Sequence, residues 1–414
     1  MFTPTKGHFA DYSHCSFARY ISDAQSAIIP RITRDLGPFL LETSEDTLSL
    51  VLETISVLCG VEDGSWFTTD LAGALTTALL DVWPKNIKGA LRPRFNQLLA
   101  CPEAISLDPI FLSILNDVLV SIASAKVPGV YEVTVKQALP RLTASIGNAN
   151  ASEWWVASSA LELLGSIARG APEAGLGEGF FAAIAPCVFE CLKVTEDRDV
   201  LQVRWRGVAF FFRHQNFFFF NGFEKKQNGV LLLTLVVRKD VGQLLSWTHP
   251  DGQPGLLHVF TVIARLLQSQ DESGGLVLGD LIIHLFRRAG DSVLPVLPDL
   301  LHAMLERMRT AQTATFLQSL VIPFAFLVYS HREAVLELLE ATSVGEDSGM
   351  DVLLNTWCEN ASTFQGFWPT RVSALALCAL LASERASVRD VVVKGDIVIT
   401  PATKDSAFCL FFSY

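Results

Sequence analysis

The stretch from Ser292 to Ser330 constrains the fold most, because it contains two helix-like segments that are too apolar to stand alone. Leucines and a methionine recur at steps of three and four in the first segment, which places on one helical face Leu294, Leu297, Leu301, Leu305 and Met308. The second segment carries on one side Phe316, Leu320, Phe324, Leu327 and Val328, and much of the rest is also apolar. A helix that is apolar on several faces must be covered on several faces. We therefore expect this hairpin to sit between neighbours, as in a stacked helical repeat.

The same pairing of amphipathic helices recurs along the chain. Residues 130–146 and 153–169 form one expected pair, and residues 255–268 and 274–289 form another. A proline recurs in the first helix of several pairs (Pro38, Pro140, Pro186 and Pro298). Once two irregular segments are set aside, these prolines follow a period of about 40 to 47 residues, the spacing of HEAT and armadillo-like units. Another first-type helix is expected over residues 66–82, with Pro84 ending it.

These observations predict an all-α chain, an α-solenoid of HEAT/armadillo-like helical hairpin repeats over residues 23–390. Residues 1–22 are expected to be an irregular N-terminal segment, and residues 391–414 an irregular tail. Residues 89–107 and 203–227 are read as odd segments inserted in the regular array.

The segment 203–227 contains the runs Phe210–Phe212 and Phe217–Phe220. One interpretation is a binding loop, since aromatic and basic side chains together can stack on bases. The other is an unspliced segment, because thymine-rich tracts translate into phenylalanine runs. The same two interpretations apply to residues 89–107.

Composition excludes several classes of protein. The chain has 414 residues, of which 50% are apolar and 18% charged, with a net charge of −11. An acidic chain is poorly suited to direct nucleic-acid binding through phosphate neutralisation, but it can attract a basic partner.

The mean hydropathy of +0.36 raises the alternative of a membrane protein. The most apolar runs, 230–237 and 321–328, are shorter than the roughly 20 residues that a spanning helix needs, so no membrane insertion is expected.

No catalytic, cofactor-binding or metal-binding residues are assigned. The chain lacks HExxH, GxSxG and P-loop motifs, so we expect no enzymatic activity and no cofactor. Gly175–Gly179 is glycine-rich, but it lies between expected helices and reads as a turn. Cys187 and Cys191 are expected to be buried thiols rather than ligands. The dispersed histidines His258, His284 and His302 are expected at the surface or capped in the core.

The remaining candidate is a surface, because solenoids bind partners along one helix of each pair. The second-type helices carry the acidic residues Asp46, Glu53, Asp117, Glu153, Glu162, Asp197, Asp199 and Asp280. One interpretation is an acidic face for a basic cargo. The other is that these charges simply occupy solvated helix faces.

Four segments resemble the importin-β (karyopherin-β) superfamily, and they are most similar to the C-terminal half of importin-nine-type receptors: residues 37–58, 256–290, 315–328 and 371–383. The resemblance implies a nuclear import receptor, shuttling between cytoplasm and nucleus. Its implied partners are basic cargo proteins such as core histones, the Ran GTPase, whose GTP form releases cargo, and nucleoporins. Two departures are the length, less than half that of a full receptor, and the absence of an acidic run like the family's long acidic insertion. The alternative is a general HEAT-repeat scaffold or a regulatory subunit of a multiprotein complex.

Overall fold

The fold is taken from a computed structural model, which describes residues 31–32, 35–36, 45–59, 67–89, 109–147, 154–193 and 223–392. The chain divides into two compact units, residues 1–243 and 244–414. Within the described residues the regular structure of both units is helical, apart from one hairpin of two short strands in the second unit and an isolated β-bridge. Segments 1–22 and 393–414, like most of the two odd segments, lie outside the described residues, and the predicted boundaries stay predictions.

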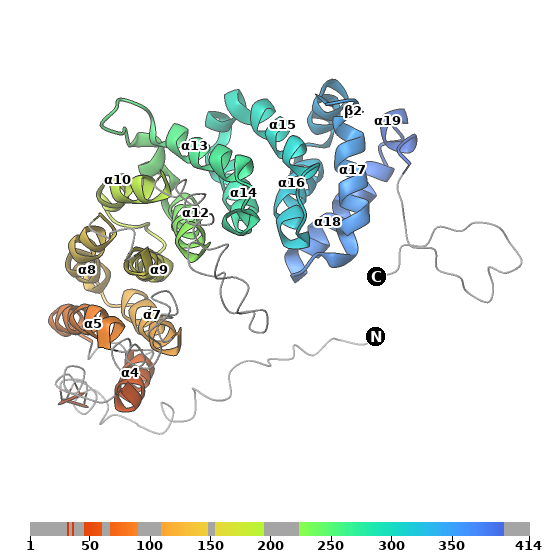
Figure 1. The fold of residues 1–414 in the computed structure, drawn as a ribbon. Helices are drawn as coiled ribbons and strands as arrows, with labels where there is room; N and C mark the ends of the chain where they lie inside the picture. The colour runs from red at the N-terminus through yellow and green to blue at the C-terminus, as the bar shows by residue number, and fades with distance from the viewer. Residues whose placement is uncertain are drawn as a thin grey trace, which may run out of the picture. The chain divides into compact units, whose positions relative to one another are not determined.

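The first unit contains two rows of helices (Figure 1). One row packs α5 (Thr69–Gly89), α8 (Val130–Gly147) and α10 (Phe180–Lys193) side by side. The other packs α4 (Glu45–Cys59), α7 (Pro109–Ala123) and α9 (Trp154–Gly170). Helix α12 (Phe223–Ser246) follows, and its Asn228 side chain donates to the Ser158 carbonyl of α9 at 3.3 Å.

The second unit repeats this layering. One row is formed by α13 (Gly255–Gln268), α15 (Leu297–Met308) and α17 (Gly349–Asn360). The other is formed by α14 (Leu278–Arg288), α16 (Ala314–Ala341) and α18 (Phe367–Leu381). The short elements are the 3-10 turns Glu272–Gly275, Gly290–Val296 and Ala361–Thr363, the hairpin of β1 (Ser343–Val344) with β2 (Asp347–Ser348), and α19 (Ala386–Arg389).

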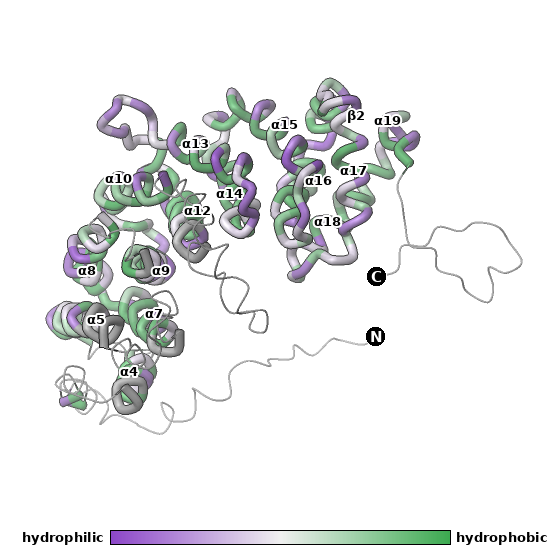
Figure 2. The backbone as a smooth tube through the Cα atoms, in the orientation of Figure 1, coloured by the Kyte–Doolittle hydropathy of each residue, from purple (hydrophilic) through white to green (hydrophobic). Residues whose placement is uncertain are grey.

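Burial follows the sequence pattern. The helices of the second unit carry both hydrophobic and hydrophilic residues (Figure 2), and most of the large apolar side chains there are buried. On α16 the predicted apolar stripe is buried on both sides, since Phe316, Phe324 and Val321 are all fully covered. Each such side chain contributes roughly 1.5 to 3 kcal/mol by leaving water. The predicted fold class, an all-α solenoid of helical hairpin repeats, is thereby confirmed.

Helix ends differ from the prediction in three places. Helix α5 continues through Pro84 to Gly89, because a proline in a helix removes one hydrogen bond without always ending the helix. Helix α12 already begins at Phe223, inside the segment read as an insertion. Helix α15 begins only at Leu297, after a 3-10 turn that includes Pro295.

That last shift exposes Leu294. The side chain is 58% exposed, whereas Leu301 and Leu305 are buried as expected. A residue that precedes proline is disfavoured in the α conformation, so Pro295 keeps Leu294 out of the regular helix. The prediction that Leu294 belongs to the buried stripe is therefore wrong.

Helix α16 is long and apolar enough to cross a membrane by length and composition alone, although the short apolar run 321–328 predicts no spanning helix. Its most apolar window is 61% buried inside the protein. The helix also has a kink at His331, where φ is −141° and ψ is 48°. Burial on α14, α17 and α18 accounts for the apolar character.

Candidate functional sites

Three of the predicted acidic residues lie on adjacent helices of the first unit. Ser56 of α4 and Ser121 of α7 meet with their hydroxyl oxygens 3.5 Å apart. Glu53 and Asp117 lie one turn before these two serines, so they share a helix face with the contact, and both are exposed. Glu162 of α9 continues the row, because its carboxylate accepts a hydrogen bond at 2.6 Å from Asn116, which neighbours Asp117. We call Glu53, Asp117 and Glu162 the acidic row.

A network of polar side chains holds Glu162, the third member of this row, in place. Asn116 is buried and its side-chain amide donates to Glu162, while its side-chain oxygen Oδ1 accepts from the Ser166 hydroxyl at 2.7 Å. Arg169 donates to the same hydroxyl at 2.7 Å. Glu162 is half-buried and already hydrogen-bonded, so it combines a structural role with a place in the row. Glu53 and Asp117 present the more open carboxylates.

The other predicted acidic residues do not extend the row. Asp280 is exposed on α14 in the second unit, where Arg287 and Arg288 of the same helix are exposed too. Asp46 is described only by its helical backbone. Glu153, Asp197 and Asp199 lie outside the described residues. The expected acidic face is thus a short row in the first unit and a mixed surface on α14.

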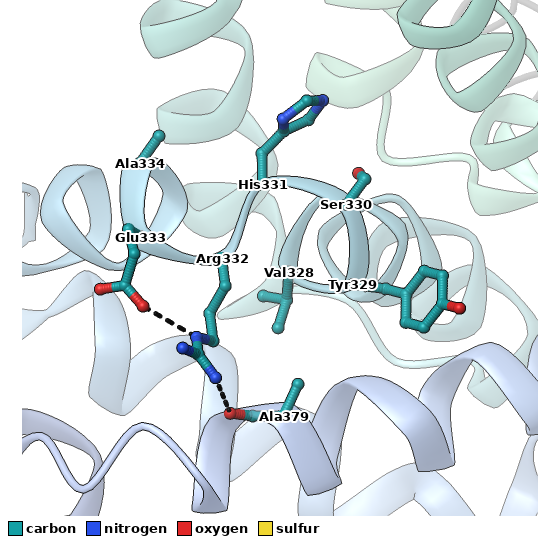
Figure 3. Close-up of a pocket in the computed structure, with 8 residues that line it drawn as sticks. All are labelled: Val328, Tyr329, Ser330, His331, Arg332, Glu333, Ala334 and Ala379. Atoms are coloured by element: carbon teal, nitrogen blue, oxygen red, sulfur yellow. Dashed lines mark hydrogen bonds and ion pairs between the residues drawn. The ribbon is translucent and has the colours of Figure 1, made fainter.

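A shallow open hollow of about 430 Å³ lies at the kink of α16 (Figure 3). The Arg332 guanidinium donates to Glu333 Oε1 at 2.8 Å and to the Ala379 carbonyl of α18 at 3.3 Å. The side chains of Tyr329 and His331 point away from this pair. The hollow therefore holds a satisfied ion pair, and its described lining residues show no paired acid and base for catalysis.

Two histidines and an aspartate converge before and within α13. The Nδ1 atom of His249 lies 2.9 Å from Asp251 Oδ1, and Nε2 of His258 lies 3.3 Å from Asp251 Oδ2. The hydrogen bond from the backbone N–H of Gln253 is the main cause that lowers the pKa of Asp251, and the two histidines lower it further. From its place in the sequence, His258 is expected only at the surface or capped in the core. The signal available was WTHPDGQPGLLH, in which His-x-Asp precedes a helix that carries a histidine in its first turn.

Cys187 and Cys191, both expected to be buried thiols, differ in burial. Cys191 is buried and Cys187 is half-buried, with its thiol donating to the Ile184 carbonyl at 3.0 Å. Burial raises the pKa of Cys187 to about 11 and that of Cys59 to about 12. A thiol with so high a pKa is a weak nucleophile at neutral pH.

The glycine-rich stretch is a turn between α9 and α10. Gly175, Gly177 and Gly179 all have positive φ, at 116°, 82° and 72°. Only glycine adopts this backbone region without strain. The prediction of a helix–helix turn is confirmed.

No family model matches the chain. Importin subunit beta-5 of Schizosaccharomyces pombe is 21% identical over 373 residues, which is 89% of this chain and 32% of that protein. Importin-9 of Drosophila melanogaster is 22% identical over 58% of this chain and 21% of its own length. Importin subunit beta-5 of Saccharomyces cerevisiae is 21% identical over 35% of this chain and 15% of its own length. The predicted resemblance to the importin-β superfamily is confirmed, and the chain spans about a third or less of these relatives.

Proposed function

We propose that this chain, which is similar to importin-β-family proteins over most of its length, is part of a nuclear import receptor. The observation that carries the proposal is the match over 89% of the chain to a protein named as an importin. The helical layering supports it, because stacked helical pairs offer long surfaces for a protein partner. On this proposal the protein moves between cytoplasm and nucleus and acts by binding rather than by catalysis.

The acidic row favours a cargo of basic proteins, with core histones among them. The net charge of −11 favours a basic partner, and Glu53 and Asp117 present carboxylates from adjacent helices. Such charges raise the rate and the specificity of association more than they raise the affinity. Ran in its GTP form would release the cargo by binding a different state of the same helical array, and nucleoporins would be contacted during passage through the pore.

The test is a pull-down of core histones by the full chain, with Ran added in its GTP or GDP form. Histone binding that Ran-GTP weakens and Ran-GDP leaves unchanged is the expected result. Histone binding that is indifferent to the nucleotide would contradict the receptor proposal. That outcome would favour the alternative, a HEAT-repeat scaffold or a regulatory subunit.

A further inference from the structure

We propose that His249, Asp251 and His258 form a binding site for a transition-metal ion, with Zn²⁺ as the best match. The three side chains offer two imidazole nitrogens and one carboxylate oxygen, all within 4.8 Å of one another. This donor set with an open fourth position is one that Zn²⁺ takes in proteins. We call it the histidine clasp, and it does not depend on the proposed transport role.

The backbone builds the clasp before any ion binds. His249 donates its N–H to the Gln253 carbonyl at 2.9 Å, and Gly252 donates back to the His249 carbonyl at 2.8 Å. Gly252 has a φ of 84°, which glycine adopts without strain. Gly255 donates to the Trp247 carbonyl at 2.8 Å, so the turn is closed at its base. These bonds hold His249 and Asp251 beside the first turn of α13, which carries His258.

The distances match a tetrahedral ion. Two ligand atoms bound at 2.0 to 2.1 Å in a tetrahedron are about 3.3 Å apart. His258 Nε2 already lies 3.3 Å from one oxygen of Asp251, and His249 Nδ1 lies 2.9 Å from the other. The two imidazole rings lie with centroids 4.2 Å apart and are tilted by 42° relative to each other. A small rotation of the carboxylate would therefore bring one oxygen and both nitrogens around a common centre.

Burial favours a bound ion and leaves it a way in. The side chains of His249 and His258 are only 17% and 12% exposed, whereas that of Asp251 is 45% exposed. The Trp247 ring packs edge-on against both imidazoles, at 5.6 and 6.3 Å between centroids. The Gln253 N–H donates to Asp251 Oδ1 at 2.9 Å, and a hydrogen bond of this kind orients a carboxylate ligand. An ion would enter from the side of the Asp251 carboxylate and would link the turn that carries His249 and Asp251 to α13.

The first experiment is a titration of the purified, chelator-treated full chain with Co²⁺, followed by competition with Zn²⁺. We expect one equivalent of Co²⁺ with visible bands of tetrahedral nitrogen and oxygen coordination, displaced by Zn²⁺. His249→Gln and Asp251→Asn should each weaken binding by at least about tenfold, since the ion loses a ligand. His302→Gln is the matched control, because His302 is a half-exposed histidine of α15 whose Nε2 lies 3.4 Å from Glu306, and it should leave binding unchanged.

Thiols are the competing ligands, and they give a different spectrum. Binding to Cys187 and Cys191 would show intense thiolate charge-transfer absorption and would be lost in Cys187→Ser. Bound Co²⁺ with that absorption, or affinity unchanged in Asp251→Asn, would overturn the proposal. A second measurement guards against misfolded variants: Zn²⁺ should raise the thermal midpoint of the wild-type chain but not that of Asp251→Asn, provided that both give the same far-ultraviolet circular dichroism. An equal rise in both would also overturn it.

Discussion

The backbone N–H of Thr313 donates to the carboxylate of Glu272 at 2.8 Å, which joins the turn before α14 to the residue that directly precedes α16. The Gln312 N–H donates to the same carboxylate at 2.7 Å, and the Thr313 hydroxyl does so at 2.6 Å. The buried guanidinium of Arg307 completes the group at 3.4 Å. Thr313 precedes α16 directly, so Glu272 satisfies helix-start donors from 41 residues away in the chain.

Glu272→Gln should lower the free energy of unfolding by about 1 to 3 kcal/mol, because donors and a buried cation lose their charged acceptor. Chemical denaturation followed by circular dichroism measures the change. The control is Glu337→Gln, an exposed glutamate on α16, which should alter stability by less than about 0.5 kcal/mol. Equal effects of the two substitutions would contradict the role given to Glu272.

The contribution of Glu272 should also depend on pH. Burial raises the pKa of its carboxyl, but the Thr313 hydroxyl, the two backbone amides and Arg307 together lower it below the ordinary 4.5. A carboxyl with a lowered folded pKa stabilises the fold above its unfolded pKa and loses this effect as pH falls through the folded value. The stability difference between wild type and Glu272→Gln should thus be constant above about pH 5 and shrink below pH 4.5. A difference that stays constant down to pH 3 would be evidence against this account.

A close approach of α14 to α16 depends on Gly279. Its N–H donates to the Ser319 hydroxyl at 2.8 Å, and a Cβ at this position would lie 2.5 Å from the Ser319 carbonyl oxygen. Because the obstacle is backbone, the helices must separate, and overpacking of this kind costs about 1 to 3 kcal/mol. Gly279→Ala should therefore lower the thermal midpoint. Gly147→Ala, with nothing within 4 Å of its added Cβ, should be neutral or slightly stabilising.

The periodicity of apolar residues in the sequence predicted the paired helices and most of their buried positions. Leu301 and Leu305 are buried as their spacing indicates, and the paired helices follow from it. Leu294 departs because the following proline changes the local backbone, which a count of apolar positions ignores. Glu272 reaches Thr313, and His249 meets His258, through tertiary placement. Helical periodicity could not identify the capping carboxylate, because Glu272 and Thr313 share no periodic spacing, and the signal for the histidine clasp was the local segment 247–258 rather than a period.

Substitutions in the acidic row test whether its charges attract the cargo, without disturbing the fold. The double variant Glu53→Lys with Asp117→Lys changes two exposed side chains, one on α4 and one on α7, so the fold should persist. Association with core histones should slow by about tenfold or more at low salt, because the row would repel a basic surface. Stopped-flow binding at two ionic strengths measures this, and the deficit should shrink as salt rises. The control is Glu337→Lys with Glu346→Lys, which makes the same change in net charge at exposed positions of the second unit. If both double variants slow association equally, net charge and not the acidic row attracts the cargo.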